Sequence, residues 1–238
     1  MRMRKKPNLI PRMEKCERVQ IKQPEALRGK WRAMFPAYDE LWLEIGCGKG
    51  RFTLGTAQAE PKNMLIAIER VEDAMVTAME RVCDAGVGNV RFISRDALKL
   101  REIFSAGEIS RIFINFCDPW PKSRDAKHRL TAPGFLRMYA DLLPPGGQIH
   151  FKTDNLPLFE WSVEQLKNEG WEISELTNDL HGEGECGVMT DYEAKFHAQG
   201  VKINRLVAEK TENTKDGASG EPARLRNAAL SDARGAEK

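Results

Sequence analysis

The sequence has no long apolar run. No stretch of about 18 apolar residues occurs in its 238 residues, so we expect no transmembrane helix. Its basic beginning lacks the apolar stretch of a secretory signal, and we therefore expect a cytoplasmic protein with no membrane contact. The five cysteines form no CxxC pair and the four histidines show no ligand spacing. We expect neither a disulfide framework nor a metal site.

Positive charge is concentrated at the front of the chain. The formal net charge is only +2, but residues 1–32 hold eleven lysines and arginines against three acidic residues, a net +8. Residues 33–208 carry twenty against twenty-six, a net −6. The basic segment fits either a polyanionic partner, whose phosphates release counterions on binding, or a solvated terminus that binds nothing.

Length and composition indicate one main domain. With 41% hydrophobic and 30% charged residues, a chain of 238 residues suits a single α/β core with appendages. We expect a basic, partly flexible N-terminal arm over residues 1–35, the domain over 36–208 and a disordered charged tail over 209–238. The tail is rich in Ala, Gly and charged residues and offers only Leu225 and Leu230 as large apolar anchors.

Short apolar runs alternate with segments of helical periodicity, as in successive βαβ units. We expect five leading strands over residues 41–45, 64–68, 90–93, 111–116 and 148–151. Helices are expected over 51–59, 72–85, 133–142 and 158–169, and two late strands over 171–176 and 202–208. The pattern predicts an α/β fold with a doubly wound, Rossmann-like, mostly parallel sheet of seven strands.

A glycine loop follows the first expected strand. In Glu44-Ile-Gly-Cys-Gly-Lys-Gly50, the residues Gly46, Gly48 and Gly50 let the backbone turn sharply and approach a ligand closely. Glu69 ends the next strand, where a carboxylate accepts hydrogen bonds from ribose hydroxyls. These features indicate a nucleoside site for NAD or S-adenosylmethionine. The GxGxG spacing and Glu44, which repels a pyrophosphate but suits a sulfonium, favour S-adenosylmethionine.

Polar and aromatic residues also follow the third and fourth strands. Asp96 is suited either to accept from an adenine amino group or to cap the helix expected over 97–104. The segment Asn115-Phe-Cys-Asp-Pro-Trp-Pro-Lys122 holds Asp118 and Trp120 in a loop stiffened by two prolines. A basic cluster then follows, suited to phosphate contacts or to a solvated helix face: Lys122, Arg124, Lys127, His128, Arg129 and Arg137.

Two further segments complete the candidate site. Asp154 follows the fifth strand in Phe151-Lys-Thr-Asp-Asn155, at the same edge of the sheet as the other acids. Thr190-Asp-Tyr-Glu193 lies in a glycine-rich, irregular stretch, which we interpret either as a binding loop or as a flexible segment.

Four motifs follow one another along the chain, at residues 44–50, 118–122, 152–155 and 190–193. With these motifs in this order, residues 40–208 closely resemble the bacterial tRNA (guanine-N7-)-methyltransferases of the TrmB family. The Asp-Pro-Trp-Pro-Lys and Thr-x-Tyr-Glu segments are each specific to that family. The resemblance implies the class I S-adenosylmethionine-dependent methyltransferase fold. It also implies methyl transfer to N7 of guanosine 46 in the tRNA variable loop, giving 7-methylguanosine. The partner would be tRNA, and the chain a monomer or homodimer.

The resemblance also implies roles for individual residues. The family's cofactor-binding positions correspond to the loop glycines Gly46, Gly48 and Gly50 and to the acids Glu44, Glu69, Asp96 and Asp118, and Asp118 is also the expected catalytic residue. Its tRNA-side or guanine-side positions correspond to Lys122, Asp154, Thr190, Asp191, Tyr192 and Glu193. We expect Tyr192 or Trp120 to stack on the guanine, and Glu193 or Asp154 to accept from its N1–H and N2 amino group.

Three other functions fit parts of the sequence. A nicotinamide-dependent oxidoreductase needs GxGxxG and a proton-relay pair such as Tyr-x-x-x-Lys, which the three tyrosines do not supply. A non-catalytic RNA-binding module gives no role to the acids of the crevice, which repel RNA. A methyltransferase acting on a protein or a small molecule stays open on spacing alone, although the two basic clusters favour RNA.

Overall fold

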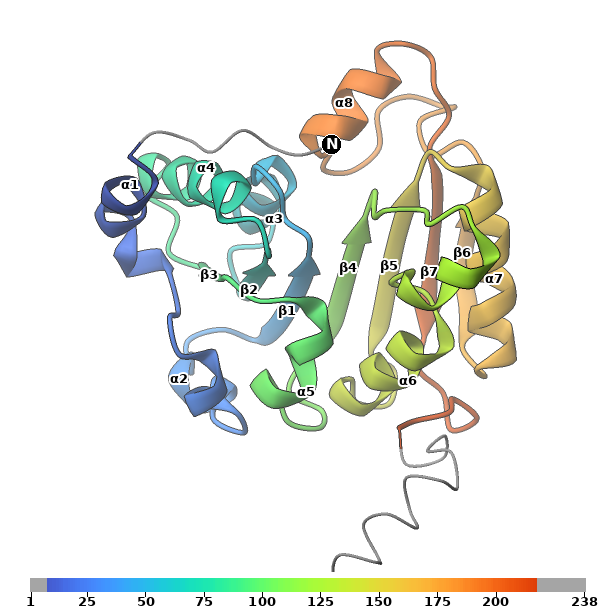
Figure 1. Cartoon of the computed structure of the whole chain (residues 1–238), viewed down its shortest axis with the longest axis horizontal. Coiled ribbons are helices and arrows are strands. Elements are labelled where there is room, and N and C mark those ends of the chain that lie inside the picture. The colour runs from blue at the N-terminus through green and yellow to red at the C-terminus, as the bar shows by residue number, and fades with distance from the viewer. Residues whose placement is uncertain (1–7, 218–238) are drawn as a thin grey trace, which may run out of the picture.

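The computed structural model describes residues 8–217, which build a seven-stranded sheet with helices on both faces (Figure 1). The strands are β1 (Glu40–Ile45), β2 (Asn63–Ile68), β3 (Val90–Ile93), β4 (Arg111–Asn115), β5 (Gln148–Thr153), β6 (Glu172–Thr177) and β7 (Asn204–Glu209). Their order is β3-β2-β1-β4-β5-β7-β6. The first five pair in parallel, and β7 runs antiparallel to both β5 and β6. The expected doubly wound, mostly parallel sheet is confirmed.

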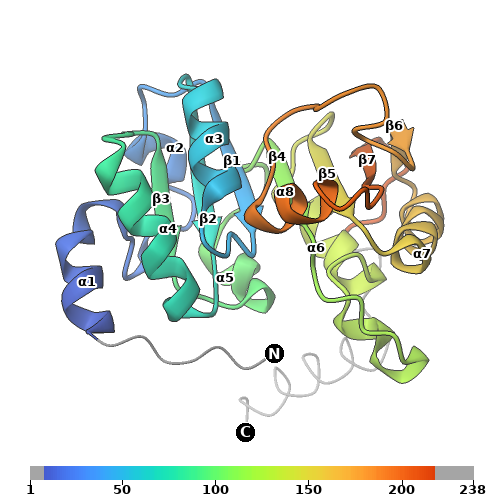
Figure 2. The ribbon, with the colours of Figure 1, turned by 90° about the horizontal axis from the view of Figure 1, so that it is seen from above.

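Helices cover the two faces of the sheet in separate groups. On one face lie α3 (Arg51–Ala59) and α4 (Glu72–Asp84), with α1 (Leu9–Lys15) packed on α4. The other face is covered by α2 (Trp31–Met34), α5 (Leu100–Ile103), α6 (Pro133–Leu142) and α7 (Leu156–Asn168). A further helix, α8 (Asp191–His197), crosses the carboxyl edge of the sheet near β4 and β5 (Figures 1 and 2). Short 3-10 turns lie at Glu17–Val19, Pro24–Leu27, Ala97–Lys99 and Ser123–His128.

Alternation along β1 decides which side chains meet which helices. Leu41, Leu43 and Ile45 lie in the core cluster that includes α5 and α6, whereas Trp42 packs with Phe52 of α3 on the opposite face. Successive side chains of a strand point to opposite faces, so the side chain of the intervening residue 44 is directed toward α3.

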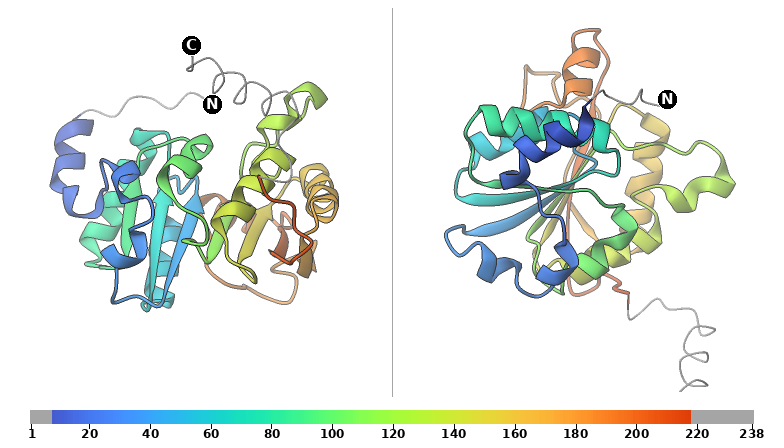
Figure 3. Two further views of the ribbon diagram at one scale, coloured as in Figure 1. Left: turned by 90° about the horizontal axis from the view of Figure 1, so that it is seen from below. Right: turned by 60° about the vertical axis from the view of Figure 1, so that its left-hand side comes forward.

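Residues 8–35 pack against the domain instead of projecting as a separate arm. Trp31 is fully buried, and its Nε1 donates to the carbonyl of Ile103 at 2.9 Å. The carboxylate of Glu108 accepts from the backbone N–H of Trp31 at 3.1 Å. Gln20 forms a parallel bridge with Phe92, so the segment runs along the β3 edge of the sheet (Figure 3). The sequence analysis did not predict this packing, because the few apolar residues of the segment are interspersed with many basic ones. Residues 1–7 lie outside the described part.

The described part of the expected tail also contacts the domain. Strand β7 extends to Glu209, and the backbone N–H of Lys215 donates to the carbonyl of Glu169 at 2.9 Å. Residues 218–238, which form most of that expected tail, lie outside the described residues. None of the helices within residues 8–217 combines the length and the apolar character that crossing a membrane requires.

Candidate active site

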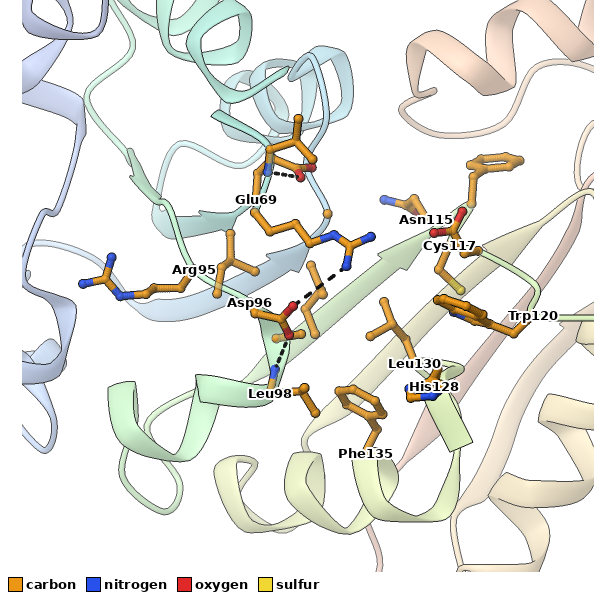
Figure 4. Close-up of a pocket in the computed structure, with 18 of the residues that line it drawn as sticks. Glu69, Arg95, Asp96, Leu98, Asn115, Cys117, Trp120, His128, Leu130 and Phe135 are labelled. Carbon is orange, nitrogen blue, oxygen red and sulfur yellow. Dashed lines mark hydrogen bonds and ion pairs between the residues drawn. The ribbon is translucent and has the colours of Figure 1, made fainter. Parts of the chain in front are cut away.

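A pocket of about 710 Å³ opens at the carboxyl ends of β1 to β4. Strand order reverses between β1 and β4, which is the point where parallel sheets of this type hold their ligands. Three of the expected acids, Glu69, Asp96 and Asp118, line this pocket together with Trp120. In Figure 4, Glu69 and Asp96 lie on one side of the pocket and Trp120 on the other.

The glycine loop reaches the pocket at Gly46, and its three glycines have two different roles. All three adopt positive φ, at 79° for Gly46, 55° for Gly48 and 79° for Gly50. A Cβ at Gly46 or Gly48 would meet no atom within 4 Å, so the backbone there faces free space into which a ligand fits. A Cβ at Gly50 would lie 2.5 Å from the Cβ of Ala78, so this glycine serves the packing of α3 on α4.

Backbone hydrogen bonds orient Glu69 at the end of β2. Its carboxylate accepts from the N–H of Gly48 at 3.1 Å and from the N–H of Val71 at 2.9 Å. The two bonds tie the acid to the glycine loop and hold it at the pocket wall. A fixed carboxylate at this place is suited to accept hydrogen bonds from two ribose hydroxyls.

Asp96 both caps a turn and lines the pocket. Its Oδ1 accepts from the N–H of Leu98 at 2.9 Å, so it caps the turn that follows β3. Its Oδ2 lies 4.0 Å from Nη1 of Arg70, and its side chain also lines the pocket. The cap fixes the carboxylate without removing it from the site.

The loop after β4 carries two aromatic residues in an unusual backbone conformation. Phe116 and Trp120 have φ values of 52° and 42°, in the left-handed region that bulky residues rarely adopt. The guanidinium of Arg129 donates to the carbonyls of Pro119 and Trp120, both at 3.0 Å, and so holds the loop. Asp118 lies between the two aromatics and lines the pocket. Such strain is typical of loops whose shape serves binding or catalysis.

Glu44, which we expected to contact the cofactor, is not among the residues that line the pocket. Its side chain is directed toward α3, where its carboxylate accepts from the hydroxyl of Thr53 at 2.6 Å and is only 2% exposed. Burial raises the pKa of this carboxyl to about 7, although the hydrogen bond from Thr53 and the charge of Lys152 oppose the rise. The strand alternation explains the difference, because Ile45 and not Glu44 faces the pocket side.

Asp154 and Tyr192 meet beside the pocket. The hydroxyl of Tyr192 donates to Oδ2 of Asp154 at 3.1 Å, and partial desolvation together with this carboxylate raises the pKa of the phenol. The ring centroid of Tyr192 lies 5.1 Å from that of Phe116, which lines the pocket, and 4.1 Å from that of Phe196. Because its side chain is exposed, Tyr192 is available to a base that enters from this side.

Thr190 and Glu193 form a helix cap where we expected an irregular loop. The hydroxyl of Thr190 accepts from the N–H of Glu193, and the Glu193 carboxylate accepts from the N–H of Thr190. Glu193 is fully buried and also binds Nζ of Lys152 at 2.6 Å and Nε2 of His181 at 3.0 Å. Because Glu193 is buried among these partners, the structure does not present its carboxylate to a guanine. The Thr-x-x-Glu spacing is itself a capping signature, so the sequence contained the signal.

Lys152 is a residue of this region that the sequence analysis did not single out. Its Nζ also donates to the carbonyl of Val188 at 2.9 Å and lies over the ring of Phe52. Burial lowers the pKa of this lysine, and the carboxylate of Glu193 opposes the shift. Only the fold brings these residues together, because they are far apart along the chain.

The basic cluster beside the loop is only partly available for phosphates. Arg129 holds the loop, and Arg137 forms an ion pair with Glu169 at 2.6 Å. Lys122, Arg124, Lys127 and His128 are exposed along the turn after the loop, and Lys127 and His128 also line the pocket. A nucleic acid approaching the pocket from this side would meet positive charge first.

The fold and the site together define a class of enzyme. The strand order of the doubly wound sheet is that of the class I S-adenosylmethionine-dependent methyltransferases. The glycine loop after β1 and the hydrogen-bonded acid after β2 are also features of this class, to which the chain belongs. The free space above Gly46 and Gly48 and the position of Glu69 fit that cofactor.

Comparison with known proteins identifies the family. Residues 39–206 match the protein family described as "Putative methyltransferase". The tRNA (guanine-N(7)-)-methyltransferase of Listeria monocytogenes serotype 4b is 44% identical over 209 residues, which cover 87% of this chain and 98% of that protein. The protein of the same name from Halalkalibacterium halodurans is 41% identical over 88% of this chain and 96% of its own length. The chain belongs to the tRNA (guanine-N7-)-methyltransferase family.

Solved structures support the fold. The 16S rRNA methyltransferase KamB has a TM-score of 0.61 at 16% identity, with 77% of this chain and 93% of that chain covered. The aminoglycoside resistance methyltransferase NpmB1 has a TM-score of 0.56 at 20% identity over the same shares of the two chains. At this level of identity the two matches show a common fold.

Proposed function

We propose that this methyltransferase acts on guanosine 46 in the variable loop of tRNA and converts it to 7-methylguanosine. The observation that carries the proposal is the meeting of two groups of side chains at one pocket. Glu69 and Asp96 lie on its cofactor side, while Asp118, Phe116 and the neighbouring Tyr192 lie on the side of β4. Exposed cations lie along the turn next to that second side and are suited to contact tRNA phosphates.

The chain offers a distinct contact to each part of the cofactor. The backbone at Gly46 and Gly48 would lie against the amino-acid portion, Glu69 would accept from the ribose hydroxyls, and Asp96 would accept from the adenine amino group. S-adenosylmethionine supplies a methyl group on a positively charged sulfur. Glu44 would act behind the loop, through its bond to Thr53, and not as a cofactor contact.

Asp118 would act on the acceptor by orientation and charge. Guanine N7 has an in-plane lone pair, so no general base is needed and the chain must align the base with the methyl group. Positive charge grows on the purine during transfer, and a fixed carboxylate beside it stabilises that charge. Tyr192 and Trp120 offer aromatic faces for the base, and Asp154 offers a carboxylate for its N1–H and N2 edge.

Transfer of labelled methyl to unmodified tRNA tests the proposed position. Nuclease digestion identifies the modified nucleoside, and a parallel tRNA carries adenine in place of guanine 46. We expect 7-methylguanosine in the first tRNA and no label in the second. Label in another nucleoside, or equal label in both tRNAs, would overturn the assignment to position 46. The cytoplasmic location and the monomeric or dimeric state stay predictions from the sequence.

Replacing the carboxylate of Asp118 tests its role directly. We expect Asp118→Asn to lower kcat by about 100-fold, since the amide keeps the shape and removes the charge that stabilises the methylated purine. Asp125→Asn is the matched control, because Asp125 lies in the next turn and does not line the pocket. Near-normal turnover of Asp118→Asn would refute the electrostatic role.

A further inference from the structure

The helix α8 carries Tyr192, and three consecutive residues tie it to three parts of the fold. Asp191 binds Arg81 of α4, Tyr192 binds Asp154 after β5, and Glu193 binds Lys152 within β5. The last of these contacts is a buried ion pair with both side chains under 10% exposed. It fixes α8 to the sheet from below, while the contact of Asp191 reaches sideways to α4.

The contact between Arg81 and Asp191 joins the two halves of the site. Nη1 of Arg81 lies 2.7 Å from Oδ2 of Asp191, and Nη2 lies 3.1 Å from Oδ1, which is the two-pronged geometry that fixes a carboxylate in one orientation. Arg81 lies on α4, the helix that begins just after Glu69, whereas Asp191 opens the helix that carries Tyr192. In Figures 1 and 2, α8 lies between α4 and the β5 side of the sheet.

We infer that Arg81 is a positioning residue for the acceptor guanine, acting through Asp191 and α8. This inference rests on the proposed function. The pair holds the first turn of α8 against α4, and so holds the ring of Tyr192 against Phe116 and its hydroxyl on Asp154. A base that enters the pocket then contacts a Tyr192 side chain that is already in position.

The loss of this contact has a kinetic signature. Without Arg81, the first turn of α8 samples undocked positions in the free enzyme, and tRNA binding must restore the docked one. The cost falls on binding, because affinity is reduced by the fraction of molecules that are competent. Once tRNA is bound, α8 is docked and Tyr192 is in place, so kcat at saturating tRNA is unchanged. Simple loss of fold would instead reduce the active fraction and lower kcat with KM unchanged.

Steady-state methylation by the full chain tests the inference. We expect Arg81→Ala to raise KM for tRNA roughly fivefold, the size expected for one partly exposed ion pair, with kcat within about twofold. Affinity for S-adenosylhomocysteine should stay unchanged. Arg101→Ala is the matched control, since Arg101 forms a similar pair with Asp141 between α5 and α6, at the opposite edge of the sheet (Figure 1). We expect this control to leave KM unchanged.

Two more measurements separate positioning from general destabilisation. The double variant Arg81→Asp/Asp191→Arg should bring the KM for tRNA most of the way back to the wild-type value, because it restores an ion pair with its signs reversed. Amide hydrogen exchange should be faster over residues 190–197 in Arg81→Ala and normal over β5. If Arg81→Ala behaves like Arg101→Ala, or if the exchange over α8 is unchanged, the inference is wrong although tRNA methylation by the wild-type protein stands. If the wild-type protein does not methylate tRNA guanine, the proposed function itself has failed.

Discussion

Substitution of Glu44 by glutamine should change how the stability of this protein depends on pH. The carboxylate of Glu44 is buried beneath the glycine loop, and it accepts from Thr53 within a region of low dielectric constant. A glutamine has nearly the same shape, can accept the same hydrogen bond and carries no titrating proton. The substitution therefore isolates the cost of ionising this one buried group.

The size of the effect follows from the pKa of the carboxyl. Burial raises the pKa of Glu44 from an ordinary 4.5 to about 7. A group whose folded pKa lies above its unfolded pKa stabilises the fold fully below the unfolded value, and this stability is lost as pH rises through the folded value. At about 1.4 kcal/mol per pH unit, the wild-type protein should lose about 3 kcal/mol relative to Glu44→Gln between about pH 4 and pH 8.

Urea unfolding of both proteins across this pH range measures the difference. Glu164→Gln is the control, because Glu164 is exposed on α7 and the same substitution there replaces a carboxylate that is not buried. We also expect Glu44→Gln to keep its affinity for S-adenosylhomocysteine within about threefold, since the side chain lies outside the pocket. A stability difference that does not vary with pH, together with a tenfold loss of affinity, would show that the carboxylate faces the cofactor.

Three further substitutions address the pocket and its surroundings. Glu69→Gln should weaken S-adenosylhomocysteine binding about tenfold in calorimetry, because the amide group accepts fewer bonds from the ribose; an unchanged affinity would contradict the ribose contact. Gly50→Ala should cost about 2 to 4 kcal/mol in denaturant unfolding, since its Cβ would lie 2.5 Å from that of Ala78 at a φ of 79°; a neutral result would contradict this packing. Lys122→Ala should lower the salt dependence of tRNA binding by about one unit of slope; an unchanged slope would show that Lys122 makes no phosphate contact.

Much of the sheet could be predicted from the sequence, because β1 to β4 are short, mostly apolar runs that end at a polar or glycine residue. The strands expected at 41–45, 64–68 and 90–93 lie within one residue of those observed. The placement of Glu69, Asp96 and Asp118 at one pocket also follows from the sequence, since the carboxyl ends of parallel strands share an edge.

The differences between expectation and structure concern side-chain directions and partners that the linear pattern does not contain. Glu44 lies within β1 and its side chain faces α3, and the motif alone does not say which face of the sheet this side chain takes. The Thr190–Glu193 segment has the spacing of a helix cap, but its glycine-rich surroundings favoured a loop. Lys152 and Arg81 gain their partners only through contacts across the fold, at sequence separations of 41 and 110 residues.

The strand order has a consequence for how this protein is made. Strand β7 is the last of the seven described strands to be synthesised, yet it lies inside the sheet between β5 and β6. Until β7 has joined the sheet, β5 therefore has an open edge and β6 has no strand to pair with. Such edges attract other chains and favour aggregation. Insertion of β7 between β5 and β6 is thus the step that closes both of these open edges.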